Sequence, residues 1–544
     1  GQTPGTFYLY FDMKRLMLFL LVLPFWLQAQ TSDTLRSIDQ LFSGWNNATP
    51  GGAVLVARGN QVLYQKAFGL ADLEHNTPNT VETIFECGSV SKQFTAFAAL
   101  LLAQEGKIAL SDPVHKYIPE LPDYGKPITI QQLINHTSGL KDWGSIGELA
   151  GWPRTTKVYT LELAMQILTQ QHSLNFVPGS QYSYSNAGYT VLVAIIERVT
   201  GNTLEEFTRT RMFEPLGMTH TRWRSNFRQV IPNRAVAYRS AKDSFEQLMP
   251  FENIYGHGGL LTTVHDLLIW NQQLAHPTLG GNVMPRWRAE QGVLNDGSKI
   301  GYANGLFIDS YNGFHEIGHS GATAGYRGWL AYYPAKQLSV VLLSNDGRFN
   351  PQDVGRKVAA VFLGQAAVVA PKKIDRNMKL TEATRQKWAG VWRQIDGFDT
   401  RVVEVKEDQL YLNNTPLQLL HTDTLYQRGS WWISNGQEMK IQNGGSVNRF
   451  RKVASAEPKP AMAQFTGRYW SDDAQTELRI DISGEKLWVH RGPTERFALT
   501  PAFRDAFLTD EGVLFEFTRS TGALTGLNVS MSRAYLVPFK KVIK

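Results

Sequence analysis

Two residues one helical turn apart form the first candidate for chemistry in this chain. Ser89 and Lys92 are three residues apart in the segment Gly88-Ser89-Val90-Ser91-Lys92. On a helix this spacing places both side chains on one face, so the lysine amine would lie beside the serine hydroxyl. A lysine amine held there can take the hydroxyl proton, and a helix N-terminus favours negative charge that develops near Ser89. The pattern predicts a serine nucleophile with a lysine partner.

The same spacing recurs at Ser483 and Lys486, in a turn between two strand-like segments. We expect no chemistry from that copy, and its presence shows that the spacing alone has little specificity. A second motif is therefore needed. Tyr184-Ser185-Asn186 follows Pro178-Gly179 and precedes an apolar helical stretch, so it lies in a loop carried by a rigid element. The same pattern at Tyr302 and Tyr411 leads into strand-like residues, so we select Tyr184 and Asn186.

The segment His315-Glu316-Ile317-Gly318-His319 spells the motif of zinc proteases. That motif needs a helix, which brings both histidines to one metal. Five glycines between 313 and 328 make a helix unfavourable. In a strand, at roughly 3.3 Å per residue, the two histidines would be about 13 Å apart. Zinc bonds are only about 2 Å long, so we predict no metal site, and we expect no cofactor.

Residues from about 32 to 365 mix helical and strand patterns around these motifs. Ser91–Gln104 carries apolar residues at helical spacing, which predicts a helix buried on one face. Tyr189–Val199 is apolar on most faces and reads as a core helix. Gly328–Tyr333 and Leu338–Ser344 predict a hairpin at the centre of an antiparallel sheet. Helices before and after such a sheet predict an α/β sandwich.

After Ala366–Lys373 the pattern changes to short strands separated by turns. Two segments of about 80 residues resemble each other, which indicates a tandem duplication joined by the linker Ala454–Ala461. Strands that must close their own edges favour small antiparallel β-barrels. We therefore expect upstream residues and a signal peptide at 1–29, a catalytic domain at 30–368, and β-barrel-like repeats at 380–453 and 462–544.

The overall composition excludes several classes of protein. The chain has 544 residues, with 43% hydrophobic and 19% charged residues, which is typical of a globular protein. One cysteine, Cys87, excludes an intramolecular disulfide framework and cysteine-based metal sites. The net charge of +7 comes from basic residues spread along the chain, so nucleic acid is not an expected partner.

The N-terminal residues have the pattern of a signal peptide. Met13-Lys14-Arg15 is basic, Leu16–Leu27 is apolar, and Ala29 offers a small residue for cleavage. Twelve helical residues span about 18 Å, too short for a bilayer core of roughly 30 Å. We expect a periplasmic or secreted protein without a stable membrane span, and the oligomeric state stays open.

Together these motifs resemble the serine β-lactamase and penicillin-binding protein superfamily, in its class C-like branch, which also holds D-aminopeptidases, DD-peptidases and esterases. The trio is S-x-x-K at Ser89 and Lys92, Y-x-N at Tyr184 and Asn186, and H-x-G at His319 and Gly321. Supporting phrases include Leu133–Leu140 and Gly258–Trp270. The β repeats more loosely resemble the barrel domains of D-aminopeptidases. The resemblance implies a β-lactamase/transpeptidase-like domain with a helical subdomain, followed by two barrels.

The resemblance also implies a role for each motif residue. Ser89 would be the nucleophile, and Lys92 and Tyr184 would share the work of base and acid. Asn186 would hold the substrate amide. The backbone N–H groups of Ser89 and Ala322 would form an oxyanion hole, with Gly321 permitting close approach of the chain to the substrate.

His319 stands where the family usually has a lysine. At pH 7.5 only about a tenth of a histidine with an ordinary pKa is charged, so it attracts a carboxylate weakly. The neutral ring can still donate one hydrogen bond, and alternation along a strand points Glu316 away from it. We expect substrates without a carboxylate to be favoured, unless an arginine from elsewhere takes the role of the lysine.

Four further residues near the motifs have a structural interpretation. Cys87 is expected to be a small core residue and His136 a structural one. Trp143 and Trp152 either line the substrate cleft or serve packing. In the β repeats, loops such as Gly492–Phe497 are candidates for shaping the cleft, although the repeats carry none of the motifs.

The sequence thus predicts an exported serine hydrolase acting through an acyl-enzyme on amides or esters. D-amino-acid peptides or peptidoglycan fragments are the favoured substrates. One alternative is a carboxylesterase or weak β-lactamase of the same fold. Another is a non-catalytic protein that binds or senses peptidoglycan or β-lactams, although the complete motif set argues against it.

Overall fold

The computed structural model describes Gly1 and residues 35–544, except 365–378, 396, 413–414, 428–429, 444–445, 458–460, 493–494 and 543–544. The expected signal peptide from Met13 to Ala29 and the segment Ala366–Lys373 therefore lie outside the described residues. Among the described helices, none combines the length and the hydropathy needed to cross a bilayer.

A six-stranded antiparallel sheet forms the centre of the first domain, in the order β10-β11-β12-β13-β1-β2. The predicted hairpin occupies the two central positions, which confirms this part of the fold. Val340 and Leu342 pack towards the helix α11, whereas Val341 and Leu343 pack towards helices on the other face. The strands are β1 (Gly52–Arg58), β2 (Gln61–Phe68), β10 (Phe307–Tyr311), β11 (Phe314–Thr323), β12 (Tyr326–Tyr333) and β13 (Leu338–Ser344).

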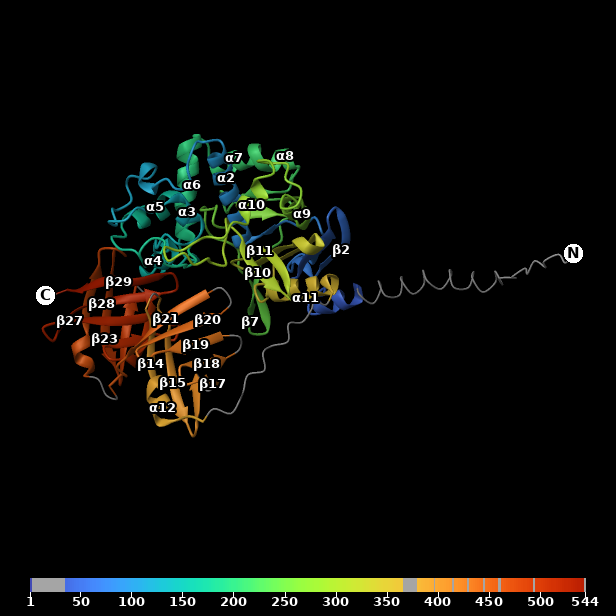
Figure 1. Cartoon of the computed structure of the whole chain (residues 1–544). Helices are drawn as coiled ribbons and strands as arrows, with labels where there is room; N and C mark the ends of the chain where they lie inside the picture. The colour runs from blue at the N-terminus through green and yellow to red at the C-terminus, as the bar shows by residue number, and fades with distance from the viewer. Residues whose placement is uncertain are drawn as a thin grey trace.

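Helices cover both faces of this sheet and form a helical subdomain beside it, in the upper half of Figure 1. They are α2 (Lys92–Gln104), α3 (Ile130–Ile134), α4 (Trp143–Leu149), α5 (Leu161–Thr169), α6 (Asn186–Thr200), α7 (Leu204–Thr208), α8 (Glu214–Leu216), α9 (Val264–Gln272), α10 (Met284–Arg288) and α11 (Pro351–Leu363). Short strands join them: β3 (Leu70–Asp72), β4 (Thr77–Pro78), β5 (Phe85–Glu86), β6 (Arg222–Trp223), β7 (Tyr238–Ala241), β8 (Ser244–Gln247) and β9 (Leu260–Thr262).

The helix α2 is buried more completely than its amphipathic pattern predicts. All its residues from Lys92 to Leu102 are buried, because it lies between the sheet and the helical subdomain. Its polar residues have partners there. The hydroxyl of Thr95 donates to the carbonyl of Gly256 at 2.7 Å, and Oε1 of Gln93 accepts from Trp270 at 3.1 Å. The expectation of one buried face was therefore too narrow.

Two closed eight-stranded antiparallel barrels follow, which confirms the predicted fold class. The first follows α12 (Glu382–Trp388) and contains β14 (Gly390–Gln394), β15 (Thr400–Lys406), β16 (Gln409–Leu412), β17 (Thr415–His421), β18 (Thr424–Gln427), β19 (Ser430–Ser434), β20 (Glu438–Asn443) and β21 (Ser446–Val453). The second contains β22 (Gly467–Ser471), β23 (Thr476–Ser483), β24 (Lys486–Arg491), β25 (Glu495–Phe503), β26 (Ala506–Leu508), β27 (Leu514–Ser520), β28 (Ala523–Met531) and β29 (Ala534–Lys541).

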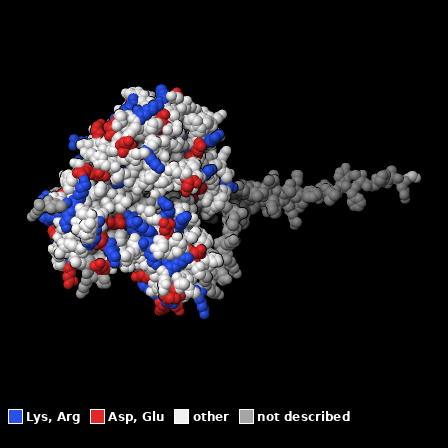
Figure 2. Space-filling model, turned by 60° about the vertical axis from the view of Figure 1, so that its left-hand side comes forward, with Lys and Arg blue, Asp and Glu red and all other residues white. Residues whose placement is uncertain are grey.

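The second barrel packs directly against the helical subdomain. Ile146 and Leu149 of α4 belong to the same apolar cluster as the interior of this barrel, and Figure 1 shows α4 next to β29. The two barrels contact each other through Val391 and Phe503, and through an ion pair between Arg393 and Glu516. On the face shown in Figure 2, acidic and basic side chains lie interspersed over the described surface.

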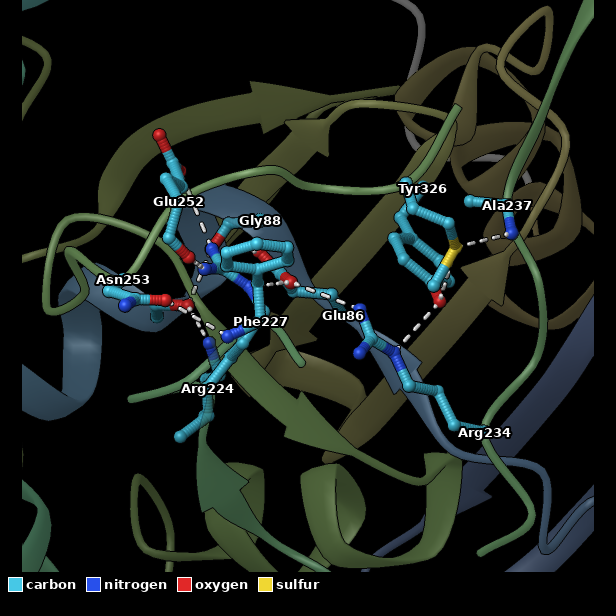
Figure 3. A network of polar contacts seen from close by, with 12 residues as sticks. Glu86, Gly88, Arg224, Phe227, Arg234, Ala237, Glu252, Asn253 and Tyr326 are labelled. Carbon is cyan, nitrogen blue, oxygen red and sulfur yellow. Dashed lines mark hydrogen bonds and ion pairs between the residues drawn. The ribbon is translucent and has the colours of Figure 1, made fainter. Parts of the chain in front are cut away.

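A buried network of charges holds the strand that precedes Ser89. Glu86, which is fully buried, accepts from Arg224 at 2.8 Å, and Arg234 lies 3.9 Å from the same carboxylate. Arg224 also lies 3.4 Å from Glu252, which accepts from Arg154. Figure 3 shows Arg224 beside both carboxylates. The network fixes β5, and through it the start of the segment that carries Ser89.

We expect Arg224→Met to lower the free energy of unfolding by about 3–5 kcal/mol, because it leaves the buried carboxylate of Glu86 without its main partner. Arg239→Met is the matched control, since Arg239 pairs with Glu246 at the surface, with 59% and 52% of the side chains exposed. We expect at most about 1 kcal/mol from that change. Urea unfolding of the full chain measures both. Equal losses in the two variants would contradict a structural role for the network.

Candidate active site

The structure brings Ser89 and Lys92 into contact. Ser89 lies in the short 3-10 helix η1 (Gly88–Ser91), and Lys92 begins α2. Nζ of Lys92 lies 3.2 Å from Oγ of Ser89. The lysine is fully buried, whereas Ser89 is partly exposed. The arrangement leaves the hydroxyl open to a substrate while the amine is kept from water.

The amine of Lys92 contacts three oxygen atoms. Nζ lies 3.0 Å from Oδ1 of Asn186 and 2.6 Å from the carbonyl of His257, and both oxygens can only accept. Three N–H groups of an ammonium ion could donate to the three oxygens, and a neutral amine could instead donate to two of them and accept from the hydroxyl of Ser89. Burial, and secondarily the charge of Arg533, lowers the pKa of Lys92 well below its usual value. Lys92 is therefore suited to take a proton.

Tyr184 and Asn186 lie on the other side of this amine. Ser185 caps α6, since its hydroxyl accepts from the backbone N–H of Ala187, and Tyr184 precedes it. The ring of Tyr184 lies 4.8 Å from Nζ of Lys92. Its hydroxyl is buried and makes no hydrogen bond within the described residues. Burial raises the pKa of the Tyr184 phenol, and the nearby Ser89 hydroxyl opposes this shift without reaching hydrogen-bonding geometry. The phenol is therefore protonated at neutral pH.

The glycine positions bring β11 against the segment that carries Ser89. A Cβ at Gly321 would lie 1.9 Å from the carbonyl oxygen of Cys87 and 3.0 Å from the amide nitrogen of Ser89. A Cβ at Gly88, where φ is +55°, would lie 2.5 Å from the amide nitrogen of Ala322. The amide nitrogens of Ser89 and Ala322 thus both lie where β11 meets η1, and Ala322 is exposed. Only glycine permits this approach.

His319 is buried behind the site and uses both ring nitrogens within the protein. Nδ1 lies 2.5 Å from the carbonyl of Ser320, which can only accept, so Nδ1 carries the proton. Nε2 then accepts from the hydroxyl of Tyr302 at 3.1 Å. Burial lowers the pKa of His319 to about 3, so the ring is neutral. In this orientation its N–H is not available to a substrate, which differs from our expectation.

Glu316 lies on the opposite face of β11, as predicted. Its carboxylate accepts from the hydroxyl of Tyr333 and from Arg356 of α11. Glu316 therefore cannot keep His319 protonated. The segment from His315 to His319 is a strand, so the helix required by the zinc-protease motif is absent from this described stretch.

Other residues close to Lys92 were missed or described only as structural. His136 packs its ring 4.2 Å from that of Tyr184, and its Nδ1 accepts from the backbone N–H of Ser185. Asp142 accepts from the backbone N–H of Asn186 at 2.7 Å. Both hold the loop that carries Tyr184. The only sequence signal was the family-like phrase that contains His136, since Asp142 follows it without a pattern of its own.

The structure also shows where Cys87 and the two tryptophans near the motifs lie. Cys87 is fully buried, and burial raises the pKa of its thiol to about 12, which agrees with a core residue. Trp143 is buried and donates to Thr190, so it serves packing. Trp152 is 49% exposed.

Arg533 is a further residue near the site that no sequence pattern selected. It lies in the turn between β28 and β29 of the second barrel, and its guanidinium carbon is 5.0 Å from the centre of the Tyr184 ring. The expected loop Gly492–Phe497, of which 493–494 are not described, instead approaches Gly151. The barrel therefore reaches the site through a different turn from the one we named.

One group among the described residues brings three potential metal-ligating side chains within 4.8 Å of each other, namely Asp72, Glu74 and His75. His75 is bonded to Asp72 at 2.7 Å, and the group shares no hydrogen bond with Ser89, Lys92 or Tyr184. It adds nothing to the chemistry of the site.

The chain is similar in sequence and in fold to several known proteins. The profile of the family named Beta-lactamase matches residues 38–365. Penicillin-binding protein 4* of Bacillus subtilis (strain 168) is 28% identical over 381 residues, covering 66% of this chain and 83% of the relative. A D-aminopeptidase of Cereibacter sphaeroides (strain ATCC 17023) is 27% identical over 540 residues, covering 93% and 98%. The octameric penicillin-binding protein homologue from Pyrococcus abyssi is 25% identical, with a TM-score of 0.55, over 77% of this chain and 99% of that chain.

We expect the reaction of Ser89 with a neutral phosphonate to be fast above the pKa of Lys92 and to be lost as the pH falls through it. Because the pKa of Lys92 is lowered, the midpoint should lie well below the ordinary value of 10.5. The rate of labelling across pH measures it. Lys141→Gln is the control, since burial lowers the pKa of Lys141 to about 8 without contact to Ser89. A midpoint that remains near 10.5, or that disappears in the control, would contradict this assignment.

Proposed function

From the premise that the chain belongs to the beta-lactamase family and is a serine hydrolase of that fold, we propose that it is exported and acts through an acyl-enzyme on amides or esters. The favoured substrates are D-amino-acid peptides or peptidoglycan fragments. The observation that carries the proposal is the contact of 3.2 Å between a buried amine at Lys92 and the partly exposed hydroxyl of Ser89.

In the proposed mechanism Lys92 accepts the proton of Ser89, and Oγ attacks the substrate carbonyl. The N–H groups of Ser89 and Ala322 stabilise the oxyanion. As the intermediate collapses, Tyr184 gives its proton to the leaving group and is reprotonated by Lys92. The pKa directions support this division of roles, since that of Lys92 is lowered and that of Tyr184 is raised. Water then releases the acyl group.

In the proposed mechanism Asn186 would hold the substrate amide. Its Oδ1 is occupied by Lys92, and its Nδ2 makes no hydrogen bond within the described residues. An amide N–H₂ beside the nucleophile can donate to a substrate carbonyl, which supports amides and peptides as substrates. The similarity to D-aminopeptidases over almost the whole chain supports D-amino-acid substrates.

We expect a fluorescent phosphonate to label the protein and to fail on Ser89→Ala. A panel of D- and L-aminoacyl anilides, short-chain esters and a chromogenic cephalosporin measures selectivity. We expect D-aminoacyl substrates to be cleaved at least about tenfold faster, in kcat/KM, than their L forms, which is about 1.4 kcal/mol of discrimination. Thermal unfolding of Ser89→Ala serves as the control for folding.

Other results of the panel would favour the alternatives. Turnover limited to esters would favour a carboxylesterase, and efficient cephalosporin turnover a β-lactamase. No labelling of the native protein, under conditions that label a control hydrolase, would contradict the enzyme and favour a binding or sensor protein.

Export is supported by the basic and apolar pattern from Met13 to Ala29. We expect expression from Met13 in a Gram-negative host to place the protein in the periplasm with Gln30 as its first residue. N-terminal sequencing of the fractionated protein measures this. An uncleaved N-terminus in the cytoplasmic fraction would contradict export.

A further inference from the structure

The turn between β28 and β29 is bound to the catalytic domain through its main chain. The carbonyl of Arg533 accepts from the backbone N–H of Asp142 at 3.1 Å and from Nδ2 of Asn175 at 3.0 Å. Two residues further on, the N–H of Tyr535 donates to Oδ1 of Asn175 at 2.8 Å, and its hydroxyl lies 3.1 Å from that of Ser183. These contacts lie on both sides of the loop that carries Tyr184. The turn is therefore held in place independently of the Arg533 side chain.

The guanidinium of Arg533 lies over the ring of Tyr184 and has no charged partner among the described residues. Its guanidinium carbon lies 5.0 Å from the centre of the Tyr184 ring, and the side chain is partly buried. In the described part of the chain, the guanidinium makes no hydrogen bond and has no carboxylate within 4.0 Å. A guanidinium carries five N–H donors in a planar fork that matches a carboxylate. No hydrogen bond or ion pair among the described residues occupies these donors beside the Tyr184 ring.

The other basic groups around the site do not supply this charge. The ring of His319 is neutral and turned into the protein. Lys92 is fully buried, and its amine already donates to the carbonyl of His257. Arg154, which also lies near Lys92, is paired with Glu252. Arg533 is thus the unpaired cation of the site among the described residues, and arginine is charged at every pH at which proteins work.

We infer that Arg533, supplied by the second barrel, binds a carboxylate in the leaving group of the substrate. The placement in the leaving group follows from Tyr184, which gives its proton to that group and whose ring Arg533 faces; in this respect the inference rests on the proposed function. The residue determines specificity from a separate domain. From the sequence we expected a neutral His319 to favour substrates without a carboxylate, unless an arginine from elsewhere took the role of the lysine. Arg533 is that arginine in this inference, so the expected preference is reversed.

The test compares substrates that differ only in the charge of interest. N-acetyl-D-alanyl-D-alanine and its C-terminal amide differ in the leaving group alone. The p-nitrophenyl esters of butyric acid and of glutaric acid, the latter with a free carboxylate, differ in the acyl group alone. We expect the native protein to favour the free acid over the amide by at least about tenfold in kcat/KM, chiefly through KM, and to show no such preference between the esters.

In Arg533→Gln the ratio of free acid to amide should fall by at least about tenfold. Arg533→Lys should retain part of it, because the charge remains. Arg504→Gln, which removes an exposed arginine from the same barrel, should leave the ratio unchanged. A ratio that is unaffected by Arg533→Gln, or that falls equally in Arg504→Gln, would overturn the inference. The inference would also be overturned if Arg533→Gln changed only the ratio of kcat/KM between the two esters.

Binding to Ser89→Ala separates this inference from the proposed function. Calorimetry on that variant compares the free acid with the amide without turnover. We expect the free acid to bind at least about tenfold more tightly, and the difference to be lost in Ser89→Ala/Arg533→Gln. Equal binding of the two ligands would overturn the inference even if the native protein hydrolyses both. If the free acid binds more tightly than the amide but the native protein hydrolyses neither, the inference is supported and the proposed function is contradicted.

Discussion

The removal of one amine from water is the constraint on which the rest of this site depends. A lysine inside a protein loses stability as an ammonium ion, and Lys92 is fully buried at the start of a central helix. Its three contacts are with Ser89, Asn186 and the carbonyl of His257. The partners come from three separate parts of the chain. The fold must therefore hold η1, α6 and the segment before β9 in register around one nitrogen atom.

Two devices maintain that register. The charge network of Glu86, Arg224 and Glu252 fixes the strand just before the nucleophile. Because Gly88 and Gly321 have no Cβ, β11 can lie directly against the same segment. A Cβ at either glycine would clash with the backbone opposite it. The first device is electrostatic and the second steric. Together they bring the backbone of Ser89 and that of Ala322 into close contact, which is the arrangement that the proposed oxyanion hole requires.

The second barrel belongs to the site in a physical sense. Its interior shares an apolar cluster with α4, and its β28–β29 turn is hydrogen-bonded to the loop region around Tyr184. A charged group at the tip of such a turn can select substrates without taking part in bond breaking. This explains how a domain with none of the catalytic motifs can still control what the catalytic domain accepts.

The sequence by itself determined the local parts of this protein. Ser89 and Lys92 are joined by a helical turn, Tyr184 and Asn186 by the start of a helix, and Gly321 and Ala322 by a strand, so their relative placement within each motif follows from backbone geometry. The duplicated strands after residue 380 likewise predicted two closed barrels, because each strand needs a hydrogen-bonded neighbour. Side chains alternate between the two faces of a strand, so the sequence also predicted that Glu316 and His319 lie on opposite faces of β11.

Only the tertiary structure decided what depends on distant contacts. Whether α2 was buried on one side or all round depended on the helices that pack over it, and no periodicity contains that information. The hydrogen bonds of His319 depend on Tyr302. The presence of Arg533 beside Tyr184 depends on how the second barrel docks, and a lone basic residue in a turn has no local signature. Desolvation and long-range charge decide the chemistry of the site, and both are properties of the packed chain.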